Sequence, residues 1–190
     1  MLLLPAYRSD QLTAALDLRP DSICLDLGDT VPLERHDAAR AFLWGEVTAA
    51  SRSYSEVLIR LSSAHALEEL TACVWPGLAG VVVPVSTAAE LLRVGEALAP
   101  LEQTRGLPLP VKLLPLIESP EAAAMIGEIT SATSRVDAVV LSLCDLADAG
   151  PFPAARAGGR GAGRHLHRRT VLADDGSEAH SRPLRDRRGG

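Results

Sequence analysis

The chain has 190 residues, of which 47% are hydrophobic and 23% are charged, and its formal net charge is −5. This length allows one domain of ordinary size rather than two, and the apolar fraction excludes an intrinsically disordered chain. No segment approaches the ~20 consecutive apolar residues of a membrane span, and the opening MLLLPAY lacks the basic residues of a signal peptide, so we expect a cytoplasmic protein.

Six short apolar runs alternate with longer amphipathic segments in the first 150 residues. In chain order these runs are Leu2–Leu4, Ile23–Leu27, Val57–Leu61, Gly80–Val83, Val111–Ile117 and Val136–Leu141. Their nearly continuous apolar character is typical of parallel strands that are buried on both faces. Ser9, Ser86 and Ser119 each precede a helical pattern as a candidate N-cap, the last with Pro120 at the first helical position. The alternation predicts an α/β fold with a parallel sheet.

Two closures of such a sheet remain open from periodicity alone: an open doubly wound sheet and a (β/α)8 barrel. The turn after the first expected strand, residues 5–8, reads PAYR and contains no GxGxxG pattern. No P-loop pattern occurs elsewhere in the sequence. These observations disfavour a nucleotide site of the Rossmann or P-loop type.

The composition changes near residue 150. Residues 1–150 carry a net charge of −10, whereas residues 151–190 carry +5 and hold 7 of the 15 glycines. Apart from Thr170–Ala173, this segment has no strand-like run, and its Gly, Pro and Arg content predicts a disordered tail. Three explanations remain open: a shifted reading frame, which we favour, a basic arm that binds nucleic acid, or a plain extension. His165 and His167 lack the cysteine partners of a common zinc site.

Charged side chains follow five of the six expected strands, at the edge where parallel α/β folds place their working residues. They are Arg8, Asp26, Asp29, Arg60, Glu118 and Asp145. Glu118 and Asp145 end long apolar runs, where an unpaired charge is costly, and two carboxylates suit a hard cation such as Mg²⁺. The arginines are suited to holding a dicarboxylate or a keto acid. Structural roles remain open as well, namely helix capping by Asp29 or Asp145 and a bridge from Arg60 to Asp26 or Glu118.

Successive blocks of residues 1–150 resemble the HpcH/HpaI aldolase and citrate lyase beta-subunit family. The blocks are LLLPAYRSDQLTAAL, DSICLDLGDTVPLERHDAAR, VLIRLSS, PGLAGVVVPVSTAAEL, LLPLIESPEAAAMIGEI and RVDAVVLSLCDLADAG, in the order and spacing of the family. The resemblance implies a (β/α)8 TIM barrel of the phosphoenolpyruvate-binding type. Only about six βα units are visible, so we expect a C-terminally truncated barrel in residues 1–150, followed by a disordered tail in residues 151–190.

The resemblance also implies a function, a Mg²⁺-dependent carbon–carbon lyase or aldolase, with Mn²⁺ as a possible substitute. The implied substrates are acyl-CoA thioesters of the citryl-CoA or malyl-CoA type, or 2-keto-3-deoxy acids. Carried over residue by residue, Glu118 and Asp145 become metal ligands, Arg60 and Asp29 catalytic residues, and Arg8 and Arg60 substrate-binding residues. The intact family implies a homo-oligomer, an assembly that a truncated chain is not expected to form, and neither a membrane nor a nucleic acid is expected as a partner.

Several positions depart from the family pattern. Gly28 replaces a glutamate of the LDLED block, and Ser62 replaces an asparagine. Val85 replaces a lysine, and His36 replaces the lysine before DAAR. For His36 we expect an exposed position on a helix. These changes indicate a divergent substrate or weakened activity, and they keep open the alternative of an inactive remnant or a non-catalytic binding protein. Because six strands would leave the first and the sixth with open edges, we also expect marginal folding.

Overall fold

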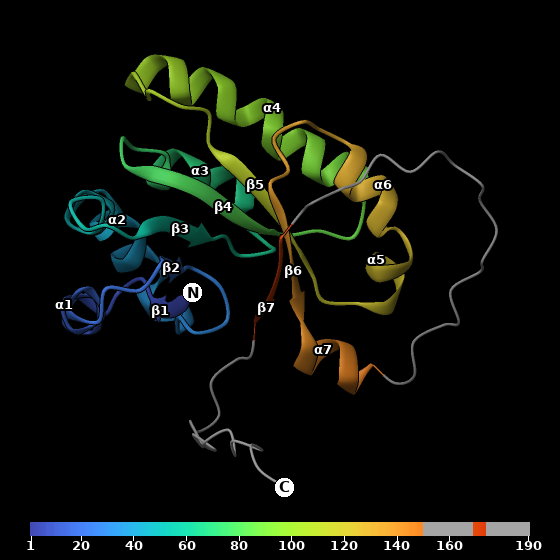
Figure 1. The fold of residues 1–190 in the computed structure, drawn as a ribbon, viewed down its shortest axis with the longest axis horizontal. Coiled ribbons are helices and arrows are strands. Elements are labelled where there is room, and N and C mark those ends of the chain that lie inside the picture. Colours follow the sequence, from blue (N-terminus) through green and yellow to red (C-terminus); the bar gives the residue numbers. More distant parts are fainter. Residues whose placement is uncertain (150–168, 174–190) are drawn as a thin grey trace, which may run out of the picture.

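The computed structural model describes residues 1–149 and 169–173 (Figure 1). Seven strands form one sheet in the order of the chain, and each strand is parallel to its neighbours. The strands are β1 (Leu2–Pro5), β2 (Ser22–Asp26), β3 (Glu56–Arg60), β4 (Leu78–Pro84), β5 (Lys112–Ile117), β6 (Ala138–Ser142) and β7 (Arg169–Ala173).

The helices lie around the outside of the curled sheet (Figure 1). They are α1 (Ser9–Asp17), α2 (His36–Ala50) after the short 3₁₀ helix η1 (Leu33–Arg35), α3 (Ala66–Cys73), α4 (Ala88–Arg105), α5 (Pro120–Ala124), α6 (Ile126–Ser131) and α7 (Leu143–Asp148). Neighbouring helices contact one another from α1 to α4, and α4 contacts α6. A sequential strand order with helices on one face is the wall of a barrel, because a doubly wound sheet reverses its strand order and has helices on both faces. The predicted barrel-type α/β fold is confirmed.

Apolar side chains on the strands alternate between two cores. Residues such as Ile23, Leu25 and Ile59 pack between the sheet and the helices. A second cluster lies inside the curl and comprises Cys24, Leu58, Val82, Leu114, Leu116, Ala138 and Val140. Since side chains alternate along a strand, Asp26 and Arg60 follow Cys24 and Leu58 on the inner face. The carboxyl end of the curl therefore begins with charged groups where the inner apolar cluster stops.

All six predicted strands are present, with ends shifted by at most two residues. Two predicted helix starts are shifted by one residue: the N-cap of α1 is Arg8 rather than Ser9, and that of α4 is Thr87 rather than Ser86. Thr87 accepts a hydrogen bond from the backbone N–H of Glu90, whose carboxylate accepts the N–H of Thr87 in return. Ser119 caps α5 as expected.

The sheet continues beyond the sixth strand, which differs from the expectation. β7 pairs with β6 from Ala138 to Ser142, so the unpaired edges within the described residues belong to β1 and β7. Five residues of the segment expected to be disordered thus form a strand. The rest of that prediction, including the two histidines, the reading-frame explanation and the basic arm, concerns residues 150–168 and 174–190, outside the described residues. No helix among the described residues combines the length and apolar character needed to cross a membrane.

Glu46 is a buried carboxylate on α2 whose side chain contacts Ser9 of α1. Ser9 is the first residue of α1 rather than its N-cap, which is Arg8, and its Oγ donates a hydrogen bond to Glu46 Oε1 over 2.8 Å. Glu46 is 6% exposed and has no salt bridge within the described part of the chain. Burial raises the pKa of Glu46 above its ordinary value, and the hydrogen bond from Ser9 only partly offsets this effect.

We expect Glu46→Gln to stabilise the fold at neutral pH. A carboxyl whose folded pKa is raised binds its proton more tightly in the folded state, so its contribution is most favourable below the unfolded pKa and declines as the pH rises through the folded pKa. Urea unfolding between about pH 4 and pH 8 should show an advantage of the variant that grows with pH. The matched exposed change, Glu96→Gln on α4, should show no such trend; an equal trend there would contradict the role of burial.

Candidate active site

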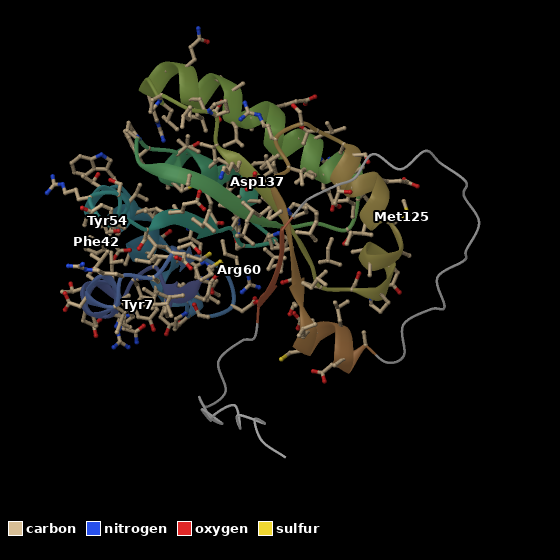
Figure 2. The ribbon with its side chains drawn as sticks, in the orientation of Figure 1. Tyr7, Phe42, Tyr54, Arg60, Met125 and Asp137 are labelled. Carbon is tan, nitrogen blue, oxygen red and sulfur yellow. The ribbon has the colours of Figure 1, made fainter. Side chains whose placement is uncertain are left out.

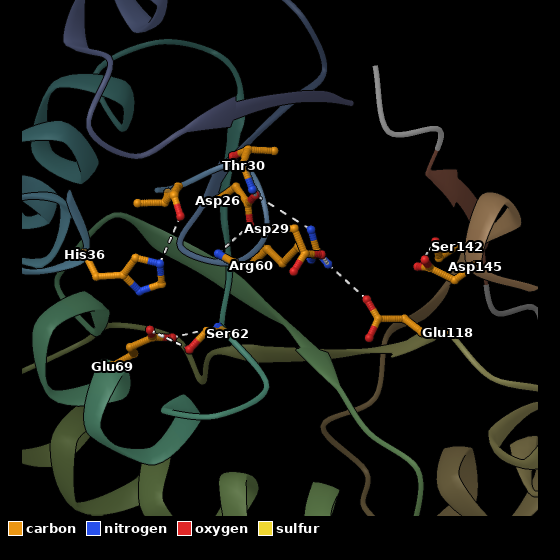
Figure 3. Close-up of polar contacts among 12 residues, drawn as sticks. Asp26, Asp29, Thr30, His36, Arg60, Ser62, Glu69, Glu118, Ser142 and Asp145 are labelled. Atoms are coloured by element: carbon orange, nitrogen blue, oxygen red, sulfur yellow. Dashed lines mark hydrogen bonds and ion pairs between the residues drawn. The ribbon is translucent and has the colours of Figure 1, made fainter. Parts of the chain in front are cut away.

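Arg60, the last residue of β3, joins three elements of the carboxyl edge. Its Nη2 donates hydrogen bonds to Glu118 Oε1 over 2.9 Å and to the carboxylate of Asp29 (Figure 3). Its Nη1 lies 3.7 Å from Asp26 Oδ2. The side chain is 11% exposed and lies inside the curl, whereas Tyr54 lies on the outer surface (Figure 2). The structural bridge from Arg60 to Asp26 and Glu118 is thus present, and the functional role of this arginine stays a prediction.

Three neighbouring carboxylates keep the guanidinium of Arg60 positively charged. Burial by itself would lower the pKa of Arg60, but the charges of Asp26, Asp29 and Glu118 outweigh burial and raise it. Its Nε is buried without a hydrogen-bond partner among the described residues. A guanidinium with unused donors is suited to binding a carboxylate or a developing negative oxygen.

Asp26 shapes the loop that presents Asp29. Asp26 ends β2 and is fully buried, and its two carboxylate oxygens accept the backbone N–H groups of Gly28 over 2.8 Å and of Thr30 over 3.1 Å. The loop therefore turns tightly around one carboxylate. Asp29 stands at its tip with its side chain 81% exposed, so it contacts Arg60 from the solvent side. Asp29 accordingly pairs with the arginine and does not cap a helix.

Glu118 and Asp145 come from neighbouring units of the barrel. Glu118 follows β5 and is half-buried, and Asp145 lies in the first turn of α7, where Ser142 Oγ donates to its Oδ2 over 2.5 Å. Burial raises the pKa of Glu118, the nearby charges of Asp29 and Asp145 add to the increase, and Arg60 opposes it. Figure 3 shows the two carboxylates at the same edge, with Arg60 beyond Glu118.

Arg8 follows β1 as predicted, and its substrate-binding role stays a prediction, whereas His36 is less exposed than expected. Arg8 forms a two-pronged pair with Asp10 through Nε over 2.9 Å and Nη2 over 2.7 Å, on the exposed surface after β1. No contact joins it to Arg60 within the described residues. His36 is half-buried rather than exposed, and its Nε2 lies 3.0 Å from the carbonyl oxygen of Val31.

Ser62 and Glu69 form a contact that sequence reasoning missed. The backbone N–H and the Oγ of Ser62 donate to the two carboxylate oxygens of Glu69, each over 2.7 Å. Glu69 is fully buried, and Arg40 Nη1 lies 3.8 Å from it. This contact fixes the backbone two residues after Arg60. A signal existed in the sequence, because Glu69 lies four residues before buried Cys73 and therefore on the same buried face of α3.

A cavity of about 640 Å³ adjoins the site at the carboxyl ends of β3, β4 and β5. Its lining includes Glu118, His65, Arg93, Val85 and Ser119. This volume lies within the range of sites that hold small molecules, about 300–1,000 Å³. A substrate seated in the cavity would therefore meet Glu118 at one wall.

The carboxylates present fit a hard divalent cation. No cluster of three or more His, Cys, Asp or Glu side chains able to hold a metal occurs in the part of the chain that the structure describes. Mg²⁺, however, commonly binds through one or two carboxylates and completes its octahedron with water and substrate oxygens. Glu118 and Asp145, which lie at the same edge of the sheet, could supply two such oxygen donors.

Residues 1–150 match the family model of the HpcH/HpaI aldolase/citrate lyase proteins. The citrate lyase subunit beta of Haemophilus influenzae is 28% identical over 150 residues, which cover 76% of this chain and 52% of that protein. The citrate lyase subunit beta-like protein of Deinococcus radiodurans is 31% identical over 124 residues, 58% of this chain and 40% of that protein. The chain spans about half the length of the curated relatives it matches.

Solved structures share the fold at lower sequence identity. The citrate lyase beta subunit of Mycobacterium tuberculosis complexed with oxaloacetate and magnesium superposes with a TM-score of 0.55 at 22% identity, over 78% of this chain and 59% of that chain. The lead(II) complex of Haloferax volcanii malate synthase gives a TM-score of 0.64 at 18% identity, over 78% and 51% of the two chains. Both superpositions agree with the curled parallel sheet described above.

Proposed function

Because this chain belongs to the HpcH/HpaI aldolase/citrate lyase family, we propose that it is a Mg²⁺-dependent carbon–carbon lyase whose site is built around Arg60. The observation that carries the proposal is the meeting of this guanidinium with carboxylates from two other strand ends, Asp29 and Glu118. The substrate class we propose is an acyl-CoA thioester of the citryl-CoA or malyl-CoA type, or a 2-keto-3-deoxy acid, with a keto acid as one product.

The proposed role of each residue follows from its charge. Glu118 and Asp145 would hold Mg²⁺ or Mn²⁺, which when bound supplies a Lewis acid for a substrate carbonyl. Arg60 binds the keto-acid carboxylate and stabilises the negative charge that develops on oxygen as the carbon–carbon bond breaks. Asp29 acts as the partner that orients Arg60. Arg8 contributes to substrate binding only if it leaves Asp10, with which it is paired.

A non-catalytic binding protein of the same family is the second candidate. It is favoured by two positions beside the site: Gly28 offers no side chain, and Ser62 is committed to Glu69 through both its N–H and its hydroxyl. Neither position supplies a polar group that reaches a ligand. The same cavity and the same arginine would then bind a keto acid without cleaving it.

A product assay separates the two candidates. We expect the full chain, incubated with Mg²⁺ and citryl-CoA, malyl-CoA or a 2-keto-3-deoxy acid, to release oxaloacetate, glyoxylate or pyruvate from one of them. Removal of the cation with EDTA should abolish release, and added Mg²⁺ should restore it. Release that survives EDTA would contradict a metal-dependent lyase. Saturable binding of a keto acid with no release from any of the substrates would support the binding protein instead.

A further inference from the structure

The contact between Arg60 and Glu118 involves one of the two carboxylates proposed as metal ligands. Nη2 of Arg60 donates to Glu118 Oε1 over 2.9 Å. A cation that binds Glu118 through Oε1 meets this N–H at the same oxygen, and two positive groups on one carboxylate also repel each other. The guanidinium and the cation are therefore competitors for Glu118.

Arg60 stays anchored when Glu118 is withdrawn from it. Its Nη1 lies 3.7 Å from buried Asp26, and its Nη2 also donates to Asp29. A guanidinium has five N–H donors in a planar fork, and Nε of Arg60 has no partner among the described residues. The side chain thus keeps its charge and its place after losing one contact, and the Nη2 N–H released from Glu118 is then free for an anion.

Four carboxylates, those of Asp26, Asp29, Glu118 and Asp145, gather at this edge of the sheet. Within the described residues, Arg60 is the one cation within salt-bridge distance of any of them. The edge therefore carries excess negative charge even with Arg60 in place. This charge attracts a second cation to the edge. Once bound, the cation neutralises Glu118 and weakens its ion pair with Arg60.

We propose that Arg60 is the internal counterion of Glu118 and competes with the divalent cation for this carboxylate, so that cation binding frees the arginine for the substrate anion. The inference rests on the proposed function, because it takes Glu118 as a metal ligand. It implies an order of binding, cation before keto acid. Because binding linkage is reciprocal, it also implies that each ligand strengthens the other.

The test is the affinity for Mn²⁺ alone, measured from the electron paramagnetic resonance of free Mn²⁺. Arg60→Gln removes the competitor and should bind Mn²⁺ about tenfold more tightly than the wild type. The matched control is Arg93→Gln, because Arg93 lines the same cavity as Glu118 but forms no salt bridge within the described residues. Measurements in roughly 0.5 M KCl, where the Debye length is about 4 Å, suppress long-range charge effects. The control should then change the affinity by less than about twofold.

Two results would overturn the inference alone: unchanged or weaker Mn²⁺ binding in Arg60→Gln, or an equal gain in Arg93→Gln. Absence of Mn²⁺ binding in every protein would overturn the proposed function along with it. If Arg60→Gln does not fold, the wild type supplies the measurement by nuclear magnetic resonance. The Nε–H signal of Arg60 is assigned by its loss in Arg60→Lys. Its chemical shift should change during a Mg²⁺ titration, with the same midpoint as Mg²⁺ binding. An Nε–H chemical shift that stays constant until Mg²⁺ binding is saturated would contradict the release of Glu118 from Arg60.

Discussion

Glu118→Gln should abolish metal-dependent turnover while leaving the fold intact. The amide keeps the size of the side chain and can still accept a hydrogen bond from Arg60, but it removes the charge that binds a cation. We expect Mn²⁺ affinity to fall about 100-fold and the rate of product release to fall about 1,000-fold, equivalent to about 4 kcal/mol of transition-state stabilisation. Since Glu118 is only half-buried, the melting temperature should stay close to that of the wild type.

Glu121→Gln is the matched control for this prediction. Glu121 lies three residues further along, in the first turn of α5, and is exposed. It should therefore retain both cation affinity and turnover. Turnover in Glu118→Gln at the wild-type level would remove Glu118 from the metal site and with it the present assignment of the active site.

Asp26→Ala should cause the largest loss of stability among the site residues. The change leaves the N–H groups of Gly28 and Thr30 without their acceptor and removes the buried partner of Arg60 Nη1. Removing one member of a buried ion pair costs about 3–5 kcal/mol. Urea unfolding at neutral pH should show this loss, and the site loop should become susceptible to proteolysis.

Two further variants divide the effect of Asp26 into its parts. Asp26→Asn keeps one side-chain oxygen as an acceptor and should lose about half as much stability as the alanine variant. Asp17→Ala changes an exposed carboxylate at the end of α1 and should stay within about 0.5 kcal/mol of the wild type. Equal, small losses in Asp26→Ala and Asp17→Ala would show that the loop does not depend on Asp26.

Much of the fold could be predicted because its signals are local. A parallel strand buried on both faces must be apolar along its length, so runs such as Val111–Ile117 mark strands within two residues of their true ends. Helix starts depend on finer detail. The capping box of Thr87 and Glu90 displaced the expected start at Ser86 by one residue, because two reciprocal hydrogen bonds stabilise that start. The pairing of β7 with β6 was not predicted, because the Gly, Pro and Arg residues around its strand-like run favoured a disordered segment.

The candidate site was predictable only in part. The sequence placed Asp29, Arg60, Glu118 and Asp145 at strand ends, and the structure brings the first three into direct contact. It does not bring Arg8 to them within the described residues, because Asp10, two residues away, offers a nearer partner. Buried acids such as Glu69 were missed because an acid on an apolar stripe reveals its role only when its hydrogen-bond donors are known.

The sequence by itself determined the parallel α/β architecture and the edge at which the charged residues gather. Both follow from continuous apolar runs that can be counted along the chain and from the charged residues at their ends. Only the tertiary structure decided which charges meet. Arg60 finds its partners 31 and 58 residues away, at Asp29 and Glu118. The choice among carboxylates depends on the curl of the sheet, which sets their distances and removes them from water. That choice places the guanidinium on Glu118 and makes it a competitor for the cation.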